Sequence, residues 1–136
     1  MFEMDRTNGE GFYDAFTRYR REKRISIPQL AVLLCCSEKT IKRMKCEEPT
    51  FETVVAISIA LHLSLFQCEY LLDLENYKFN SGIKSQLLRY LVVFSSVEGI
   101  SKTSSNDKVF FSVNCCKKIL EHFGFSNSLD VTVRKS

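Results

Sequence analysis

The chain has 136 residues, of which 45% are hydrophobic and 12% aromatic, and its formal net charge is +3. These apolar residues are sufficient for one folded core, which excludes a wholly disordered chain. No apolar run reaches the ~18 residues of a membrane span, and the polar start MFEMDRTNGEGF is unlike a secretory signal. We therefore expect no membrane association and a cytoplasmic location.

The charges are unevenly distributed along the chain. Residues 18–45 carry nine Lys or Arg and two Glu, whereas residues 46–75 carry six acidic residues and no Lys or Arg. A basic segment next to an acidic one predicts that one face meets phosphate and another does not. A charged face that is merely solvated is the alternative interpretation.

The first helix is expected after a flexible arm formed by residues 1–11. The scarcity of Gly and Pro, five and two residues, favours helices throughout. A helical spacing of apolar residues predicts a helix that ends near Lys23. The apolar residues on its buried stripe are Phe12, Ala15, Phe16 and Tyr19.

Capping residues predict where the second and third helices begin. Ser26 and Gln29 have the spacing of a capping box, and Pro28 suits the first turn of a helix. Ser37 is expected to cap a short third helix. The inward residues are Leu30, Ala31 and Leu34 in the second helix, and Ile41 and Met44 in the third.

Two more helices complete the expected bundle. Thr50 is a predicted cap for FETVVAISIALHL, which is apolar nearly all round and therefore suits the centre of a core. Ser64 and Gln67 form a second predicted capping box before LFQCEYLLDL. The sequence thus predicts an all-α fold with five short helices between Phe12 and Leu74.

Residues 76–136 are expected to form a helical extension. One helix is predicted from about Ile83 to Val97, and another from Ser112 or Asn114 to Phe123, with Gly124 as its C-terminal cap. The first has an expected inner side made by Leu87, Tyr90, Leu91 and Phe94. The run KVFFSV fits a short strand without a clear partner, and the tail SLDVTVRKS fits either a frayed end or a strand that pairs elsewhere.

The six cysteines do not have the spacing of a metal or disulfide framework. They form two adjacent pairs and two single residues, with no C-x2-C motif. We interpret them as free thiols that behave as small apolar residues, and we expect no cofactor and no metal. A redox or metal sensor is the alternative, since cysteines in a basic segment have a lowered pKa.

The order of the helices and the stretch SIPQLAVLLCCSEKTIKRM resemble the lambda repressor/Cro-type (XRE family) helix-turn-helix domain. Ser26 takes the family's capping position, Leu30-Ala31 its Leu-Ala pair and Ile41 its Ile, while Cys35-Cys36-Ser37 stand at Gly-Val-Ser. The resemblance covers residues 12–75 and implies a five-helix lambda repressor-like DNA-binding bundle. Two positions depart from the family pattern: Ile27 replaces a Gln that often contacts DNA, and Cys35 replaces the turn glycine, so Cys35 is expected to be left-handed and Cys36 buried.

A helix over residues 37–46 is the predicted DNA-reading element. In this type of domain, residues near the start of the third helix meet base edges in the major groove. Glu38 and Lys39 are the expected base readers, because Glu suits cytosine N4 and Lys suits guanine O6 and N7. The full set of predicted DNA-binding residues is Ser37, Glu38, Lys39, Thr40, Lys42, Arg43 and Lys45.

These features predict a sequence-specific transcriptional regulator of the repressor kind that binds a double-stranded DNA operator. One half-site offers few contacts, so a homodimer is expected, with the extension available for dimerisation or for a protein partner. The alternatives are a protein-interaction module of the same fold and an autoregulatory antitoxin. We expect no enzyme, because the sequence offers no nucleophile–base pair, Gly-rich phosphate loop or metal-spaced cluster.

Overall fold

A computed structural model describes residues 10–101, 112–126 and 129–134. This part of the chain is mostly helical, as the sequence predicted. Its elements are α1 (Phe12–Glu22), α2 (Ile27–Leu34), α3 (Glu38–Arg43), β1 (Glu48–Pro49), α4 (Phe51–Ala60), α5 (Leu65–Leu74), α6 (Ile83–Ser101), α7 (Val113–His122) and β2 (Val133–Arg134). The predicted arm at residues 1–9 and the first four residues of KVFFSV lie outside the described ranges.

Helices α2, α3, α4, α5 and α7 begin where a side chain satisfies a free backbone N–H group of the first turn, whereas α1 begins after Gly11 without a side-chain cap. Ser37, Thr50 and Ser112 each accept a hydrogen bond from the backbone N–H three residues later. Ser26 and Ser64 do the same within complete capping boxes. The predicted caps of these helices are confirmed, and so is Gly124, which follows α7 with a φ of +90°.

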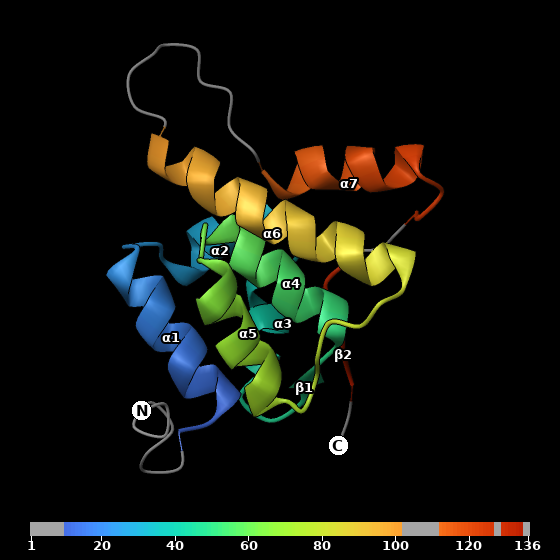
Figure 1. Cartoon of the computed structure of the whole chain (residues 1–136). Helices are drawn as coiled ribbons and strands as arrows, with labels where there is room; N and C mark the ends of the chain where they lie inside the picture. Colours follow the sequence, from blue (N-terminus) through green and yellow to red (C-terminus); the bar gives the residue numbers. More distant parts are fainter. Residues whose placement is uncertain (1–9, 102–111, 127–128, 135–136) are drawn as a thin grey trace.

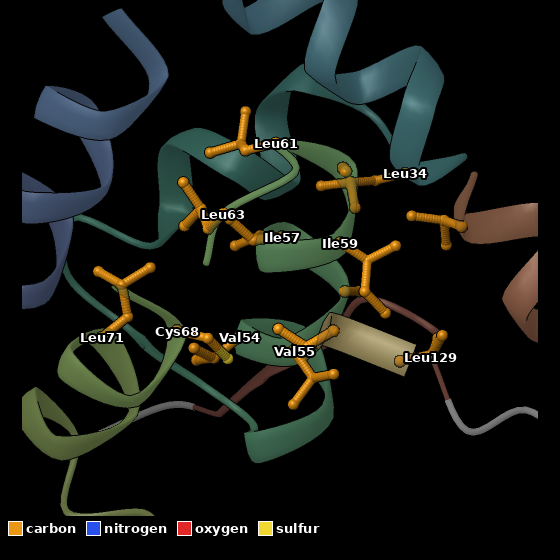
Figure 2. Packing of buried hydrophobic residues seen from close by; sticks show 14 of the residues in the cluster. Leu34, Val54, Val55, Ile57, Ile59, Leu61, Leu63, Cys68, Leu71 and Leu129 are labelled. Carbon is orange, nitrogen blue, oxygen red and sulfur yellow. The ribbon is translucent and has the colours of Figure 1, made fainter. Parts of the chain in front are cut away.

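Helix α4 is the centre of the hydrophobic core. Eight of its ten residues are buried, which explains why its sequence is apolar nearly all round. Figure 2 shows Val54, Val55, Ile57 and Ile59 leaving α4 in different directions. Side chains from every other helix that the structure describes belong to the same buried cluster.

Helix α6 packs against α4 and α5, while α7 packs against α4 (Figure 1). The inward face of α6 matches the predicted one only in part, since Leu91 is buried and Leu87 is half-buried against the core. Among the side chains of residues 83–96, the buried ones are Ser85, Leu88, Leu91, Val92 and Ser95. Tyr90 and Phe94, which were expected inside, are 61% and 40% exposed and stack on each other with ring centroids 6.0 Å apart.

The C-terminal segment returns to the start of α4. β2 pairs antiparallel with β1, so of the two alternatives for the tail, a frayed end or a pairing strand, the structure shows the pairing strand. Beside this ladder, the Thr132 N–H donates to Thr53 Oγ1 at 2.8 Å, and that hydroxyl donates to the Thr132 carbonyl at 2.9 Å. Leu129 is fully buried, and Lys117 pairs with Asp130 at 3.3 Å.

The first described residues are fixed to α1 and α5 through Glu10. Arg18 donates two hydrogen bonds to its carboxylate, at 3.1 and 3.2 Å, and the Tyr70 hydroxyl donates a third at 2.7 Å. Burial raises the pKa of Glu10, but the hydrogen bonds from Arg18 and Tyr70 outweigh it and hold the pKa below its usual value. The ionised carboxylate therefore joins the entry of the chain to the bundle.

No helix within the described ranges combines the length and the apolar character that crossing a bilayer requires.

Candidate nucleic-acid interface

The turn between α2 and α3 is built around one left-handed residue. Cys35 has φ 59° and ψ 44°, the conformation that the sequence predicted at this position. Its N–H donates to the Val32 carbonyl at 3.2 Å, and the Cys36 N–H donates to the Ala31 carbonyl at 3.0 Å. These bonds close the C-terminal end of α2 and reverse the chain toward α3.

Both helices of this unit are anchored by side chains that point into the core. Leu30 and Ile41 are fully buried, while Leu34 is 1% exposed. Ala31, at 6%, and Met44, at 4%, complete the predicted set of inward residues. With two anchors on such a short helix, the rest of α3 is left facing outward.

The structure places the predicted DNA-binding residues on one short segment. Thr40 is half-buried, and the others are exposed: Ser37, Glu38, Lys39, Lys42, Arg43 and Lys45. Ser37 and Thr40 interact with each other, since their hydroxyl oxygens lie 3.0 Å apart and the Thr40 N–H donates to Ser37 Oγ at 3.1 Å. These two hydroxyls therefore help to form the start of α3.

The four basic side chains of this segment have different surroundings. Arg43 pairs with Glu47, with Nη2 and Oε1 2.7 Å apart. The ammonium of Lys45 lies 5.7 Å from the centre of the Tyr13 ring, which holds it toward α1. Among the described residues, Lys39 and Lys42 have no hydrogen-bond or ion-pair partner. They are the two cations of the segment that are open to an anion from outside.

Other members of the basic segment 18–45 contact the protein itself. Arg18 pairs with Glu10, and Arg20 donates to the Ile25 carbonyl at 3.0 Å. Lys23 Nζ donates to the His62 carbonyl at 3.4 Å. The charge of the segment as a whole therefore overstates the charge available on the face of α3.

An open groove of about 700 Å³ runs between α1 and the residues that follow α3. Three basic residues, Arg18, Arg21 and Lys45, line it together with four acidic residues, Asp14, Glu47, Glu48 and Glu75. This mixed lining does not favour phosphate. The groove therefore marks one edge of any phosphate-binding surface on α3.

Three cysteines lie near this outward face: Cys35 and Cys36 in the turn, and the exposed Cys46, which follows Lys45 and lines the groove. The Cys35 thiol donates to Asn114 Oδ1 at 3.7 Å, which brings the start of α7 to the turn. Cys36 was expected to be buried but is half-buried; burial and the neighbouring Cys35 raise its pKa, against the effect of Lys117. Sequence reasoning missed this approach of α7, because no local pattern connects residues 79 positions apart.

The remaining thiols differ mainly in burial. Burial raises the pKa of Cys68 and of Cys116 to about 12, so both stay protonated near neutral pH. Hydrogen bonds from Ser112 lower the pKa of the exposed Cys115. All six cysteines are free thiols, and no group of three or more metal-ligating side chains occurs in the described part of the chain.

Glu47 is a second feature that the sequence analysis missed. It follows Arg43 by four residues, a spacing that favours ion pairs, so the signal was present in the sequence.

Comparisons of this chain with protein-family models, with curated proteins and with solved structures found no match. The functional argument therefore rests on the arrangement of α2, the Cys35 turn and the exposed face of α3.

Proposed function

We propose that the protein is a sequence-specific DNA-binding transcriptional regulator of the repressor kind, acting in the cytoplasm, and that α1 to α5 form a lambda repressor-like helix-turn-helix bundle. The observation that carries the proposal is the pairing of an anchored α2 with a short α3, whose outward face holds Lys39 and Lys42 without an ion-pair partner in the part of the chain that the structure describes. A buried face fixes the helix, and an exposed basic face is free to meet DNA.

The residues of α3 have distinct proposed roles. Glu38 and Lys39, in its first turn, read base edges, since Glu accepts from cytosine and Lys donates to guanine. Lys42 and Arg43, one turn later, contact phosphates and set the register on the duplex. Ser37 contributes a phosphate contact and Lys45 a further cation, whereas Thr40 supports the cap through the hydroxyl of Ser37.

The proposal includes a homodimer. A six-residue recognition helix offers few contacts to one half-site, so two copies are required for useful affinity. The residues of α6 that remain exposed, Ile83 at 78% and Tyr90 at 61%, leave apolar surface for contacts with protein. This surface also favours the second candidate function, a protein-interaction module of the same fold.

A pair of substitutions tests the proposed roles. Lys39→Ala should weaken discrimination at one base position by about 1–3 kcal/mol, because a base-edge contact is lost. Arg43→Ala should weaken binding to the operator and to its single-base variants alike, and it should reduce the salt dependence of that binding by about one phosphate contact. Binding of a panel of duplexes with single base changes, at several salt concentrations, measures both effects.

Lys118→Ala is the matched control, since Lys118 is an exposed cation on α7 and its loss changes the net charge equally. The control should retain both specificity and most of the affinity. If Lys39→Ala and Lys118→Ala changed base discrimination equally, the proposed role of Lys39 as a base reader would be contradicted. Binding to an acidic protein but to no duplex would favour the interaction module.

A further inference from the structure

The ion pair between Arg43 and Glu47 is fixed by the backbone as well as by the side chains. Nε and Nη2 of Arg43 donate to the same oxygen, Glu47 Oε1, at 3.0 and 2.7 Å. The Glu47 N–H donates to the Arg43 carbonyl at 2.9 Å, which holds the two residues in one turn beyond the end of α3. The arginine side chain is 43% exposed and the glutamate 22%, so the pair lies at the surface.

The carboxylate of Glu47 occupies the donors that Arg43 would use for a phosphate. A guanidinium group binds carboxylate and phosphate with the same planar arrangement of N–H donors. A DNA phosphate must therefore displace Glu47 before it reaches Nε and Nη2. The displaced carboxylate then stays close to the phosphate, because its backbone is held at the same turn, and like charges repel each other.

The surroundings of Glu47 strengthen this effect. Asp14, Glu48 and Glu75 line the same groove as Glu47, and the cations that line it, Arg18, Arg21 and Lys45, balance these four negative charges only in part. Lys39 and Lys42, in contrast, have no acidic partner among the described residues. On the outward surface near α3, Lys39 and Lys42 are therefore open to a phosphate, whereas Arg43 is already paired with Glu47.

We propose that Glu47 is a specificity-determining residue that competes with DNA phosphate for Arg43 and so weakens binding to arbitrary duplexes. The inference rests on the proposed function. On an operator, the base contacts of Lys39 and Glu38 hold α3 at one position in the groove, and the phosphate beside Arg43 is placed well enough to replace the carboxylate. On other sequences this placement is missing, Arg43 stays paired, and the complex has one phosphate contact fewer.

The test compares Glu47→Gln with Glu121→Gln in the full chain. Both substitutions remove one negative charge, and Glu121 is an exposed residue of α7 with no role in the pair. The measured quantity is the affinity for a duplex of random sequence as a function of salt. Glu47→Gln should bind severalfold more tightly than wild type, and the slope of log K against log salt should be steeper by about 0.9. Glu121→Gln should leave the slope unchanged.

An Arg43→Gln background shows whether the effect passes through Arg43. In that background, adding Glu47→Gln should no longer steepen the salt dependence, because the guanidinium group is absent. An undiminished steepening there would overturn the inference, as would a wild-type protein that binds DNA with Glu47→Gln and Glu121→Gln behaving alike. The melting temperatures of wild type and the four variants check that each remains folded, and this surface pair should hardly affect them.

Failure of the proposed function has a different signature. If folded wild-type protein and all variants retard no duplex at low salt, DNA binding itself is excluded, and the role of Glu47 with it. If wild type binds and only the Glu47 effect is missing, the proposed function stands without this inference.

Discussion

Cys35 shows how the conformation of one residue sets the relation between α2 and α3. A non-glycine residue in the left-handed region costs about 1 kcal/mol, and β-branched residues are disfavoured there most strongly. Cysteine is small and unbranched, so it tolerates φ 59° and adds the thiol contact to Asn114. The turn therefore joins α2 to α3 through a left-handed residue that is not a glycine.

Two substitutions at this position should act in opposite directions. Cys35→Gly should raise the free energy of unfolding by up to about 1 kcal/mol, because the backbone strain disappears. Cys35→Val should destabilise the protein by more than about 1 kcal/mol, since valine is branched at Cβ. Urea unfolding of the three proteins measures the difference, and a valine variant as stable as wild type would contradict the assigned conformation.

Local sequence rules predict only some of the residues in unusual conformations. Cys35 was predictable because it stands where the family pattern has glycine. Arg24, His62 and Asn76 also have positive φ values, near 60°, and none of them was expected there. His62 is held by its tertiary setting, since its Nδ1 lies 3.0 Å from the Ser95 carbonyl oxygen of α6. A contact between residues so far apart in the sequence leaves no local pattern from which the conformation of His62 could be predicted.

At the scale of elements, α6 shows why periodicity can identify a helix without identifying its buried face. Apolar residues occupy positions 87, 88, 90, 91, 92, 93 and 94, so they surround the helix. The predicted stripe through Tyr90 and Phe94 was therefore one of several possible faces. The structure instead buries Ser85 and Ser95, whose hydroxyls are satisfied by Asn80 and Val92.

The two neighbouring residues Tyr90 and Leu91 test the orientation of α6. Leu91 is 2% exposed, so Leu91→Ala should cost about 2–5 kcal/mol through the cavity that it leaves. Tyr90→Ala should cost less than about 1.5 kcal/mol, because it loses little more than the stacking on Phe94. Denaturant unfolding at one fixed protein concentration compares them, and a larger loss for Tyr90→Ala than for Leu91→Ala would contradict the observed orientation of α6.

The shorter helices were more predictable because several independent signals agreed. At α2, the capping box, the proline of the first turn and the apolar spacing all mark one start and one buried face. At α3, the cap and two inward residues leave a single orientation possible. Where capping residues, apolar spacing and turn residues agree, the local sequence is sufficient to predict where a helix begins and which of its faces is buried.

At the scale of the whole molecule, the C-terminal half belongs to the same core as α1 to α5. Leu88, Cys116, Leu120 and Leu129 lie in one buried cluster with the residues of α4. The segment at Thr132 also binds the first turn of α4, which follows α3 through β1. The sequence predicted helices in this region but not where they pack, because the partners are about 80 residues apart.

The distribution of charge also acts at this scale. The basic segment pointed to α3, yet Arg18, Arg20 and Lys23 are engaged elsewhere in the bundle. What remains on the outward face is Lys39 and Lys42, with Arg43 held by Glu47. Binding to DNA should accordingly depend on a few cations and be sensitive to salt.

Selection of bound duplexes from a random pool at low salt tests the central claim most directly. The account predicts an enriched operator with two related half-sites about 10 base pairs apart, or a multiple of that spacing, because a homodimer places one α3 in each major groove. It also predicts that Lys39→Ala relaxes selection at one position of each half-site. Recovery of no duplex by the folded, dimeric protein, or of a pool without any preferred sequence, would contradict the claim.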